Sequence, residues 1–220
     1  MNVIVMKRLA LATCAAGLLG ASLSACVPLV MGGAAAGSML VASDRRTSGA
    51  QLEDEGIEMR GASRIREELG TRVRVNVTSY NRQVLLTGEV PSIQDQQLVE
   101  QVVSKVDNVS SVVNDLAVLN SPTLIERSSD SLLTGRVKAR LLDAKALQSN
   151  AFKVVTERGT TYLMGRVTLA EAERATEIAR TTSGVQKVVR IFEIISQEDL
   201  DRIQPPAPAA SASAAAPIQP

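Results

Sequence analysis

The sequence predicts an α+β protein in which one small unit, with the order helix, strand, strand, helix, strand, occurs twice. The main observation is a repeated stretch: Leu85–Val90 and Tyr162–Val167 both contain an apolar run, then glycine, a charged residue and valine. A repeat of this kind indicates the architecture before any residue is assigned a role. The length of 220 residues suits two small domains with extensions. We therefore expect two tandem αββαβ domains, each a three-stranded sheet covered by two helices.

Composition limits both the cores and the partners of the chain. Aromatic residues make up 2% of the sequence and tryptophan is absent, so the cores must be built from Val, Leu, Ile and Ala. Two modest cores favour domains that pack on each other. The formal net charge is +1, which gives no reason to expect nucleic acid as a partner. Histidine is absent, and with it the commonest general base and metal ligand.

Residues 1–25 have the organisation of a secretory signal peptide. Basic Lys7 and Arg8 precede an uncharged run over residues 9–23, which is shorter than the roughly 20 residues that a membrane-spanning helix needs. Met6 stands directly before the basic pair and is an alternative start to Met1. Removal of the segment takes away two positive charges and leaves a nearly neutral chain.

The end of this segment, Leu23-Ser24-Ala25-Cys26, resembles the bacterial lipobox, in which a peptidase cuts before a cysteine that carries a diacylglycerol. Only cysteine has the nucleophilic sulfur that this thioether requires. The alternative is an ordinary signal peptide with a chance cysteine. We expect lipid attachment at Cys26, and the third acyl chain that the resemblance implies would make anchoring stable.

The residues around Cys26 bear on where the chain is located. Cys14 lies in the removed segment, so Cys26 would be the only cysteine of the mature chain and no internal disulfide would form. Val27 follows Cys26 where an aspartate would resemble an inner-membrane retention signal. We therefore expect an outer-membrane, lipid-anchored protein that faces the periplasm. Residues 26–50, rich in Gly and Ala, are expected to form the lipidated tether.

The first domain is expected over residues 51–120. Apolar residues at helical spacing, alternating valines, and a capping box before an apolar stripe predict its helices and strands. The expected elements are a helix through Ile57, Ile65 and Leu69, a strand at 73–78, a turn at 81–82, a strand at 84–87, a helix from Ser92 to Val106 and a strand at 112–118.

The second domain is expected over residues 128–196, after a linker of residues 121–127. Its elements follow the same order, and glycine at Ser183-Gly184 suits the left-handed end of its second helix. They are a helix to Asp143, a strand at 152–156, a turn at 158–159, a strand at 161–164, a helix from Thr168 and a strand at 188–194, with about five extra residues at 145–150. Residues 197–220 are expected to form a disordered Pro/Ala-rich tail.

Gly88 and Gly165 are expected to be turn glycines between a strand and a helix. A phosphate-binding glycine is the alternative, but neither residue has the flanking glycines or lysine of a phosphate loop. Catalytic sequence motifs are also absent, and acidic runs such as Glu53-Asp54-Glu55 are typical of a solvated helix surface. We expect no enzyme, no catalytic residues, no metal site and no cofactor.

One helix carries a pattern with a function of its own. In residues 131–142, Leu133, Val137 and Leu141 recur at every fourth position and can bury one face against the sheet. Leu132, Arg136 and Arg140 form a second stripe at the same spacing, with Lys138 beside it. An exposed leucine followed by cations suits an anionic phospholipid surface. The alternative is that Leu132 only packs at the helix start and the cations are solvated.

The chain resembles the double-BON-domain outer-membrane lipoproteins. The resemblance rests on the lipobox, on residues 44–51, 74–80 and 84–86 of the first unit, and on residues 162–165 and 183–185 of the second. It implies that the second domain binds anionic phospholipid through its first helix, and that the protein supports outer-membrane integrity. The exposed aromatic residue of that helix in the family is replaced by Leu132, which weakens interfacial anchoring.

The expected phospholipid contacts are Leu132, Leu133, Arg136, Lys138 and Arg140, and the expected partner is an anionic phospholipid membrane. A different class of function is also open: a periplasmic adaptor that binds the outer-membrane protein assembly machinery through the same helix or a sheet edge. A purely structural stress protein is the third alternative, and it predicts neither interaction.

Overall fold

A computed structural model describes residues 44–119, 124–144 and 147–203. The signal peptide, Cys26, most of the expected tether and the end of the expected tail lie outside these residues. The αββαβ order expected for both domains is confirmed. The first domain contains α3 (Ser48–Leu69), β1 (Arg74–Tyr80), β2 (Gln83–Val90), α4 (Ile93–Ser104), β3 (Ser111–Asn114) and β4 (Ala117–Val118).

The second domain repeats the pattern with its own additions. It contains α5 (Leu124–Asp143), the short 3-10 helix η1 (Ser149–Ala151), β5 (Phe152–Glu157), β6 (Thr160–Val167), α6 (Leu169–Arg180) and β7 (Lys187–Ile194). A further helix, α7 (Gln197–Ile203), occupies residues expected in a disordered tail. Ser196 accepts a hydrogen bond from the N–H of Asp199 at 3.0 Å, which starts this helix and corrects that expectation.

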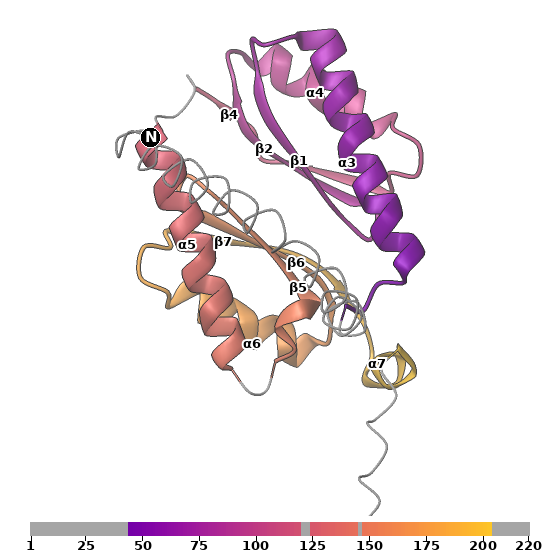
Figure 1. The fold of residues 1–220 in the computed structure, drawn as a ribbon, viewed down its shortest axis with the longest axis vertical. Coiled ribbons are helices and arrows are strands. Elements are labelled where there is room, and N and C mark those ends of the chain that lie inside the picture. Colours follow the sequence, from indigo (N-terminus) through magenta and orange to yellow (C-terminus); the bar gives the residue numbers. More distant parts are fainter. Residues whose placement is uncertain (1–43, 120–123, 145–146, 204–220) are drawn as a thin grey trace, which may run out of the picture. The chain divides into compact units, whose positions relative to one another are not determined.

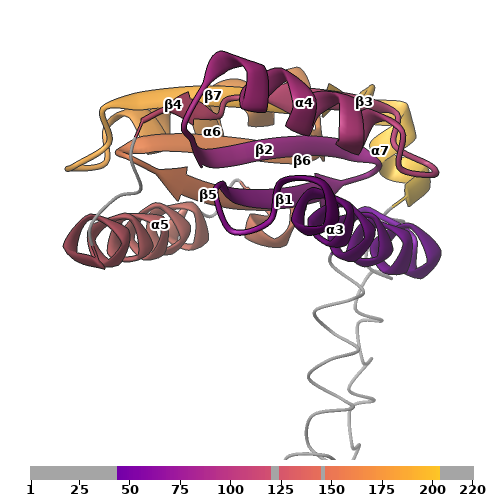
Figure 2. The ribbon, with the colours of Figure 1, turned by 90° about the horizontal axis from the view of Figure 1, so that it is seen from above.

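Each domain is a mixed sheet covered by helices on one face. Strand β1 pairs antiparallel with β2, and β3 and β4 both pair parallel with β2, so they are two halves of one broken third strand. In the second domain β5 pairs antiparallel with β6, and the unbroken β7 pairs parallel with β6. Figure 1 shows α3 and α4 over the first sheet and α5 and α6 over the second. Figure 2 shows α3 next to β1 and α5 next to β5.

Aliphatic side chains fill the core of each domain, as the composition predicts. In the first, Ile57, Val84 and Leu86 are fully buried between the helices and the sheet. In the second domain, Val137 and Leu163 are likewise buried in the core between the helices and the sheet. A third cluster joins the two domains through the sheet faces that no helix covers; its members are Tyr80, Leu85, Tyr162, Met164 and Ile191. Alternation along a strand explains this, because Leu85 points away from the face of Val84 and Leu86.

Gly88 and Gly165 belong to the scaffold, but they lie inside strands rather than at a turn. Strands β2 and β6 continue to Val90 and Val167, and the glycines pair with Val75 and Phe152. A Cβ on Gly88 would lie 2.0 Å from the carbonyl oxygen of Arg74, and one on Gly165 would lie 2.4 Å from that of Ala151. The close approach of the neighbouring strand therefore requires glycine at both positions.

Candidate functional site

Helix α5 carries the residues that the sequence singled out, and its buried side positions them. Leu133, Val137 and Leu141 are 5%, 0% and 1% exposed. We expected Leu133 among the phospholipid contacts, and the structure corrects this: its side chain is buried and lies against Gly184. The cause is helical spacing, which places Leu133 on the same face as Val137. Leu133 therefore packs on the buried side of the helix and does not face solvent.

The opposite side of α5 is open to solvent. Leu132 is 65% exposed, and Arg136 and Lys138 are also exposed. Within the described part of the chain, neither Arg136 nor Lys138 forms an ion pair. A large apolar side chain thus stands in water one turn before an uncompensated cation, which is the arrangement expected of an interfacial helix.

Arg140 has a different position from the other two cations. Its Nη1 donates to the carbonyl oxygen of Ile178 at 3.0 Å and to Oγ1 of Thr182 at 2.9 Å. Both acceptors lie at the carboxyl end of α6, where free carbonyl groups favour a positive charge. Arg140 therefore fastens α5 to α6, and any contact that it makes with a ligand comes from the rest of its guanidinium.

Leu142 is an exposed residue of α5 that the sequence reading did not single out. It is 65% exposed and follows Lys138 by one helical turn. The two residues form a short stripe beside the Leu132–Arg136 stripe. The signal was present in the sequence as an apolar residue four positions after a cation.

Asp130, in the first half of α5, holds the helix against the second sheet. Its carboxylate accepts hydrogen bonds from the backbone N–H groups of Arg158 at 2.7 Å and Gly159 at 2.9 Å. These two residues form the tight turn between β5 and β6 and have positive φ values of 50° and 69°. The turn therefore fixes the position of α5 at Asp130, and with it the position of the nearby Leu132.

The equivalent helix of the first domain differs in charge. Helix α3 contains six acidic and three basic residues, whereas α5 contains three acidic and four basic residues. Two of the basic residues of α3 are engaged: Arg60 pairs with Glu53 at 2.6 Å, and Arg64 donates to the carbonyl oxygen of Lys105 at 2.8 Å. Met59 is 70% exposed on α3, so exposed apolar area alone does not distinguish the helices. The positive charge of α5 does.

Neither a metal-binding cluster nor a membrane-spanning helix is present among the described residues. These residues contain no cluster of three or more acidic, cysteine or histidine side chains that could hold a metal ion. None of their helices is long and apolar enough to cross a membrane. The exposed side of α5 combines large apolar residues with cations that form no ion pair within the described part of the chain.

Comparison with known proteins places this geometry in a family. The model of the BON domain matches residues 60–120 and 129–195. The outer membrane lipoprotein DolP of Haemophilus influenzae is 34% identical over 194 residues, which cover 86% of this chain and 97% of that protein. The 21 kDa hemolysin of Actinobacillus pleuropneumoniae is 30% identical over 154 residues, which cover 69% of this chain and 79% of that protein.

The two matches fall on the two αββαβ domains that the structure contains, and the similarity to the Haemophilus lipoprotein extends along nearly its whole length. The repeated unit, its mixed three-stranded sheet and its two covering helices are therefore those of the BON domain. The chain belongs to the BON-domain family, as a double-BON lipoprotein similar to DolP.

Proposed function

We propose that the chain is a non-enzymatic, lipid-anchored protein of the outer membrane, facing the periplasm, that binds anionic phospholipid through helix α5 and supports outer-membrane integrity. The observation that carries the proposal is the exposed side of α5. Leu132 is exposed to water, and among the described residues Arg136 and Lys138 have no ion-pair partner. The buried side of α5 and Asp130 hold this helix in place.

The energetics of this surface fit an anionic bilayer. Leu132 and Leu142 would enter the boundary between head groups and acyl chains, while the cations meet lipid phosphates. Each basic residue near an anionic membrane contributes about 1 kcal/mol, and this attraction weakens as salt screens it. Leucine contributes apolar area without the interfacial preference of an aromatic ring, so binding by α5 alone should be modest and lipid attachment at Cys26 should do most of the anchoring.

The test is co-sedimentation of the acyl-free chain, starting after Cys26, with vesicles that contain phosphatidylglycerol or cardiolipin. The wild-type chain should bind these vesicles, bind vesicles of neutral lipid weakly, and release as salt is raised. The double variant Leu132→Glu/Arg136→Glu should lose binding. Binding of this variant equal to that of the wild type would rule out α5 as the site.

A matched control comes from the first domain. Met59→Glu/Arg66→Glu makes the same two kinds of change, one exposed apolar residue and one exposed cation, on the equivalent helix α3. It changes the net charge by the same amount as the α5 variant. The control should bind as the wild type does, because the proposed surface is specific to the second domain.

A second candidate function is an adaptor for outer-membrane protein assembly. It is favoured by an apolar corner of the first domain, where Ile93, Val118 and Leu119 are 59%, 40% and 58% exposed. Val118 pairs with Val90, and the N–H of Leu119 donates to the carbonyl oxygen of Val90, so both lie at the strand end that leads into Ile93. An exposed apolar corner of this kind is typical of a contact with another protein.

The adaptor function predicts a pull-down of assembly proteins in detergent that persists in Leu132→Glu/Arg136→Glu. The same pull-down should be lost in Ile93→Ser/Leu119→Ser. Capture that is lost with the α5 variant and restored by added phospholipid would contradict it and support the lipid-binding function.

A further inference from the structure

Three residues ahead of α3 contact both domains, and we name Asp44, Arg45 and Arg46 the clasp. The side chain of Arg45 is 1% exposed. Its Nη1 and Nη2 donate to the two carboxylate oxygens of Glu171 at 2.8 and 2.7 Å, and Nη1 also donates to the carbonyl oxygen of Arg166 at 2.9 Å. These acceptors belong to the second domain, although Arg45 directly precedes the first. A two-pronged arginine–carboxylate pair of this kind is strong and fixes geometry.

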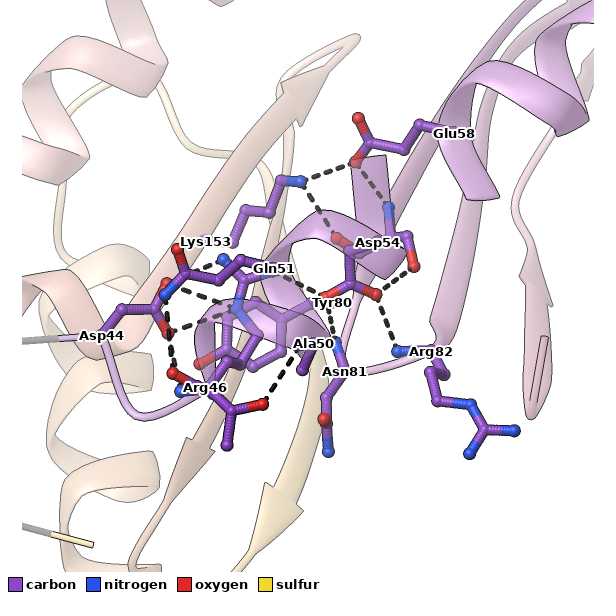
Figure 3. Close-up of polar contacts among 12 residues, drawn as sticks. Asp44, Arg46, Ala50, Gln51, Asp54, Glu58, Tyr80, Asn81, Arg82 and Lys153 are labelled. Atoms are coloured by element: carbon purple, nitrogen blue, oxygen red, sulfur yellow. Dashed lines mark hydrogen bonds and ion pairs between the residues drawn. The ribbon is translucent and has the colours of Figure 1, made fainter. Parts of the chain in front are cut away.

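Arg46 makes the corresponding contacts with the first domain (Figure 3). Its Nη1 donates to Asp54 at 2.7 Å, its Nη2 donates to Asp44 at 2.7 Å, and its guanidinium lies 4.3 Å from the centre of the Tyr80 ring. Burial would lower the pKa of Arg46, but the hydrogen bonds to Asp44 and Asp54 outweigh it and raise the pKa, so the charge is permanent. Two consecutive arginines are thus held, one by each domain.

The clasp is attached to parts of the fold that are themselves fixed. Asp54 is 1% exposed, and Tyr80 belongs to the apolar cluster between the two sheets. Lys153 of β5 reaches the same place from the second domain: its Nζ contacts Glu58 at 2.7 Å and the carbonyl oxygen of Ser79 at 3.0 Å (Figure 3). The chain ahead of α3 therefore passes over the contact between the domains and is bonded to both sides of it.

A buried arginine is stable only while its partner is present. Removing one member of a buried ion pair leaves an uncompensated charge and is strongly destabilising. The Arg45–Glu171 pair contrasts with Arg180–Glu177 on the outer side of α6, whose side chains are 67% and 49% exposed. Exposed pairs of that kind contribute little. The clasp is therefore a built contact, and the exposed pair supplies a control of the same chemistry.

We propose that the clasp is a positioning device, which fastens residues 44–46 onto the second domain as well as the first and so holds α5 in one orientation. The connection to α5 runs through α6: Glu171 lies in the first turn of α6, and Arg140 of α5 bonds to Ile178 and Thr182 at its end. The existence of the clasp is independent of lipid, whereas its effect on α5 rests on the membrane function proposed above.

The clasp is tested with trypsin on the full chain, because trypsin cuts after arginine and Arg45 is buried only while the clasp is closed. Glu171→Gln leaves Arg45 and Arg46 in place and retains an acceptor for the Thr168 N–H, so α6 keeps its cap. Cleavage after Arg45 or Arg46 should be about tenfold faster than in the wild type, since proteolysis follows the population of the open form. Trypsin should cut the Glu177→Gln variant at the wild-type rate.

Equal cleavage rates in all three proteins would overturn the clasp. If Glu171→Gln is also cut inside the second domain, that domain has lost structure, and Arg45→Leu is used in its place. Arg45→Leu places an apolar side chain at the buried position and removes the ion pair with Glu171. The peptide bond after Arg46 remains available to trypsin. This variant should again be cut about tenfold faster than the wild type, and an unchanged rate would overturn the proposal.

The effect on α5 is tested with a tryptophan probe, because the chain contains no other tryptophan. Leu132→Trp in the full lipidated chain should be quenched by brominated lipid in phosphatidylglycerol vesicles, and adding Arg45→Leu should reduce the quenching. Equal quenching with and without Arg45→Leu would overturn the claim that the clasp positions α5. It would not affect the claim that the clasp joins the two domains. If neither protein is quenched, α5 does not meet the membrane; the proposed function and the positioning role then both fail, and the trypsin result stands on its own.

Discussion

Asp54 and Asp130 occupy equivalent places in the two domains and make the same contact. Each accepts the two backbone N–H groups of a tight turn between the first two strands: Asn81 and Arg82 for Asp54, Arg158 and Gly159 for Asp130. The turn residues have φ values between 48° and 69°, a region that costs free energy outside glycine and asparagine. A helix side chain thus stabilises an unfavourable turn in both copies.

Sequence reading assigned Asp54 to a solvated acidic run, and the structure corrects that. Asp54 is 1% exposed and also accepts hydrogen bonds from Ser79 at 2.6 Å and Arg46 at 2.7 Å. Apart from Arg46, the donors come from a turn and a strand that are distant in sequence, so the composition around Asp54 does not indicate them. Aligning the repeats would have given the one available signal, an acidic residue at the same place in both first helices.

The first prediction concerns Asp54→Asn and pH. Burial would raise the pKa of Asp54, but hydrogen bonds from Ser79, the Arg82 N–H and Arg46 lower it below its usual 3.8. A lowered pKa contributes stability that is present above the usual pKa and lost as pH falls through the folded value. The free energy of unfolding of Asp54→Asn should therefore be about 1–3 kcal/mol lower than that of the wild type near pH 7. The difference should shrink below about pH 4.

Urea unfolding of both proteins at the two pH values measures this difference. Other carboxylates titrate equally in wild type and variant, so the difference isolates Asp54. A gap that stays the same near pH 3 would show that the charge of Asp54 does not contribute.

Strands β2 and β6 show, at the scale of elements, how far a sequence pattern determines a role. The repeated apolar stretch predicted a strand in each domain, and the structure confirms both. It did not predict where the strands end, because the glycine was read as a turn. Glycine is needed instead for the approach of the neighbouring strand, which depends on pairing with Val75 and Phe152.

The second prediction is that Gly88→Ala destabilises the first domain by at least about 3 kcal/mol. Gly88 has φ +122°, and a Cβ would collide with a backbone carbonyl that cannot move aside. Gly135→Ala is the matched control: Gly135 lies in α5 with nothing within 4 Å of an added Cβ. That control should gain about 0.5–1 kcal/mol from helix propensity. Thermal and denaturant unfolding measure both changes; a Gly88→Ala protein as stable as the wild type would contradict the close approach.

The break in the third strand of the first domain and helix α7 were missed for different reasons. The break between β3 and β4 places Asp115 where it accepts a hydrogen bond from the Tyr162 hydroxyl at 2.7 Å, a contact with the other domain. Nothing near Asp115 in the sequence indicates it. Helix α7 follows from Ser196, Glu198 and Asp199, a local signal that was hidden by the Pro/Ala-rich residues after it.

The contact between the domains is the main feature at the scale of the whole molecule. Its centre is the apolar cluster of Tyr80, Leu85, Tyr162, Met164 and Ile191. Polar contacts lie around it: Arg74 of the first domain bonds to Glu157 of the second and to Glu89 of its own domain. Burial raises the pKa of Tyr80 to about 12, as expected of a phenol in this contact. The small aliphatic cores predicted that the domains would pack on each other, and they do.

The third prediction is that the two domains unfold as one unit in the wild type and separately once the cluster is opened. Met164 is 0% exposed within it, and Met164→Ala should remove about 2–5 kcal/mol. Far-UV circular dichroism during urea unfolding should show one transition for the wild type and two for the variant. A single, merely shifted transition in the variant would mean that the cluster does not couple the domains.

Duplication was readable from the sequence because each copy repeats a local pattern. The clasp was not: Arg45 and Glu171 are distant in the chain, and only the packed domains bring them together. The same limit applies to the surface of α5. Periodicity separated Leu132 from the buried Val137 and Leu141. Only the packing of α6 shows that Arg140 is engaged, whereas Arg136 forms no ion pair with any residue that the structure describes.

The most direct test of the account is the affinity of the acyl-free chain for phosphatidylglycerol vesicles, measured for three proteins. The wild type and Met59→Glu/Arg66→Glu should bind equally, and Leu132→Glu/Arg136→Glu should bind at least about tenfold more weakly, because it loses an inserted side chain and reverses a charge at the lipid surface. Equal binding of all three proteins, or equal loss in both variants, would contradict a lipid-binding surface on helix α5.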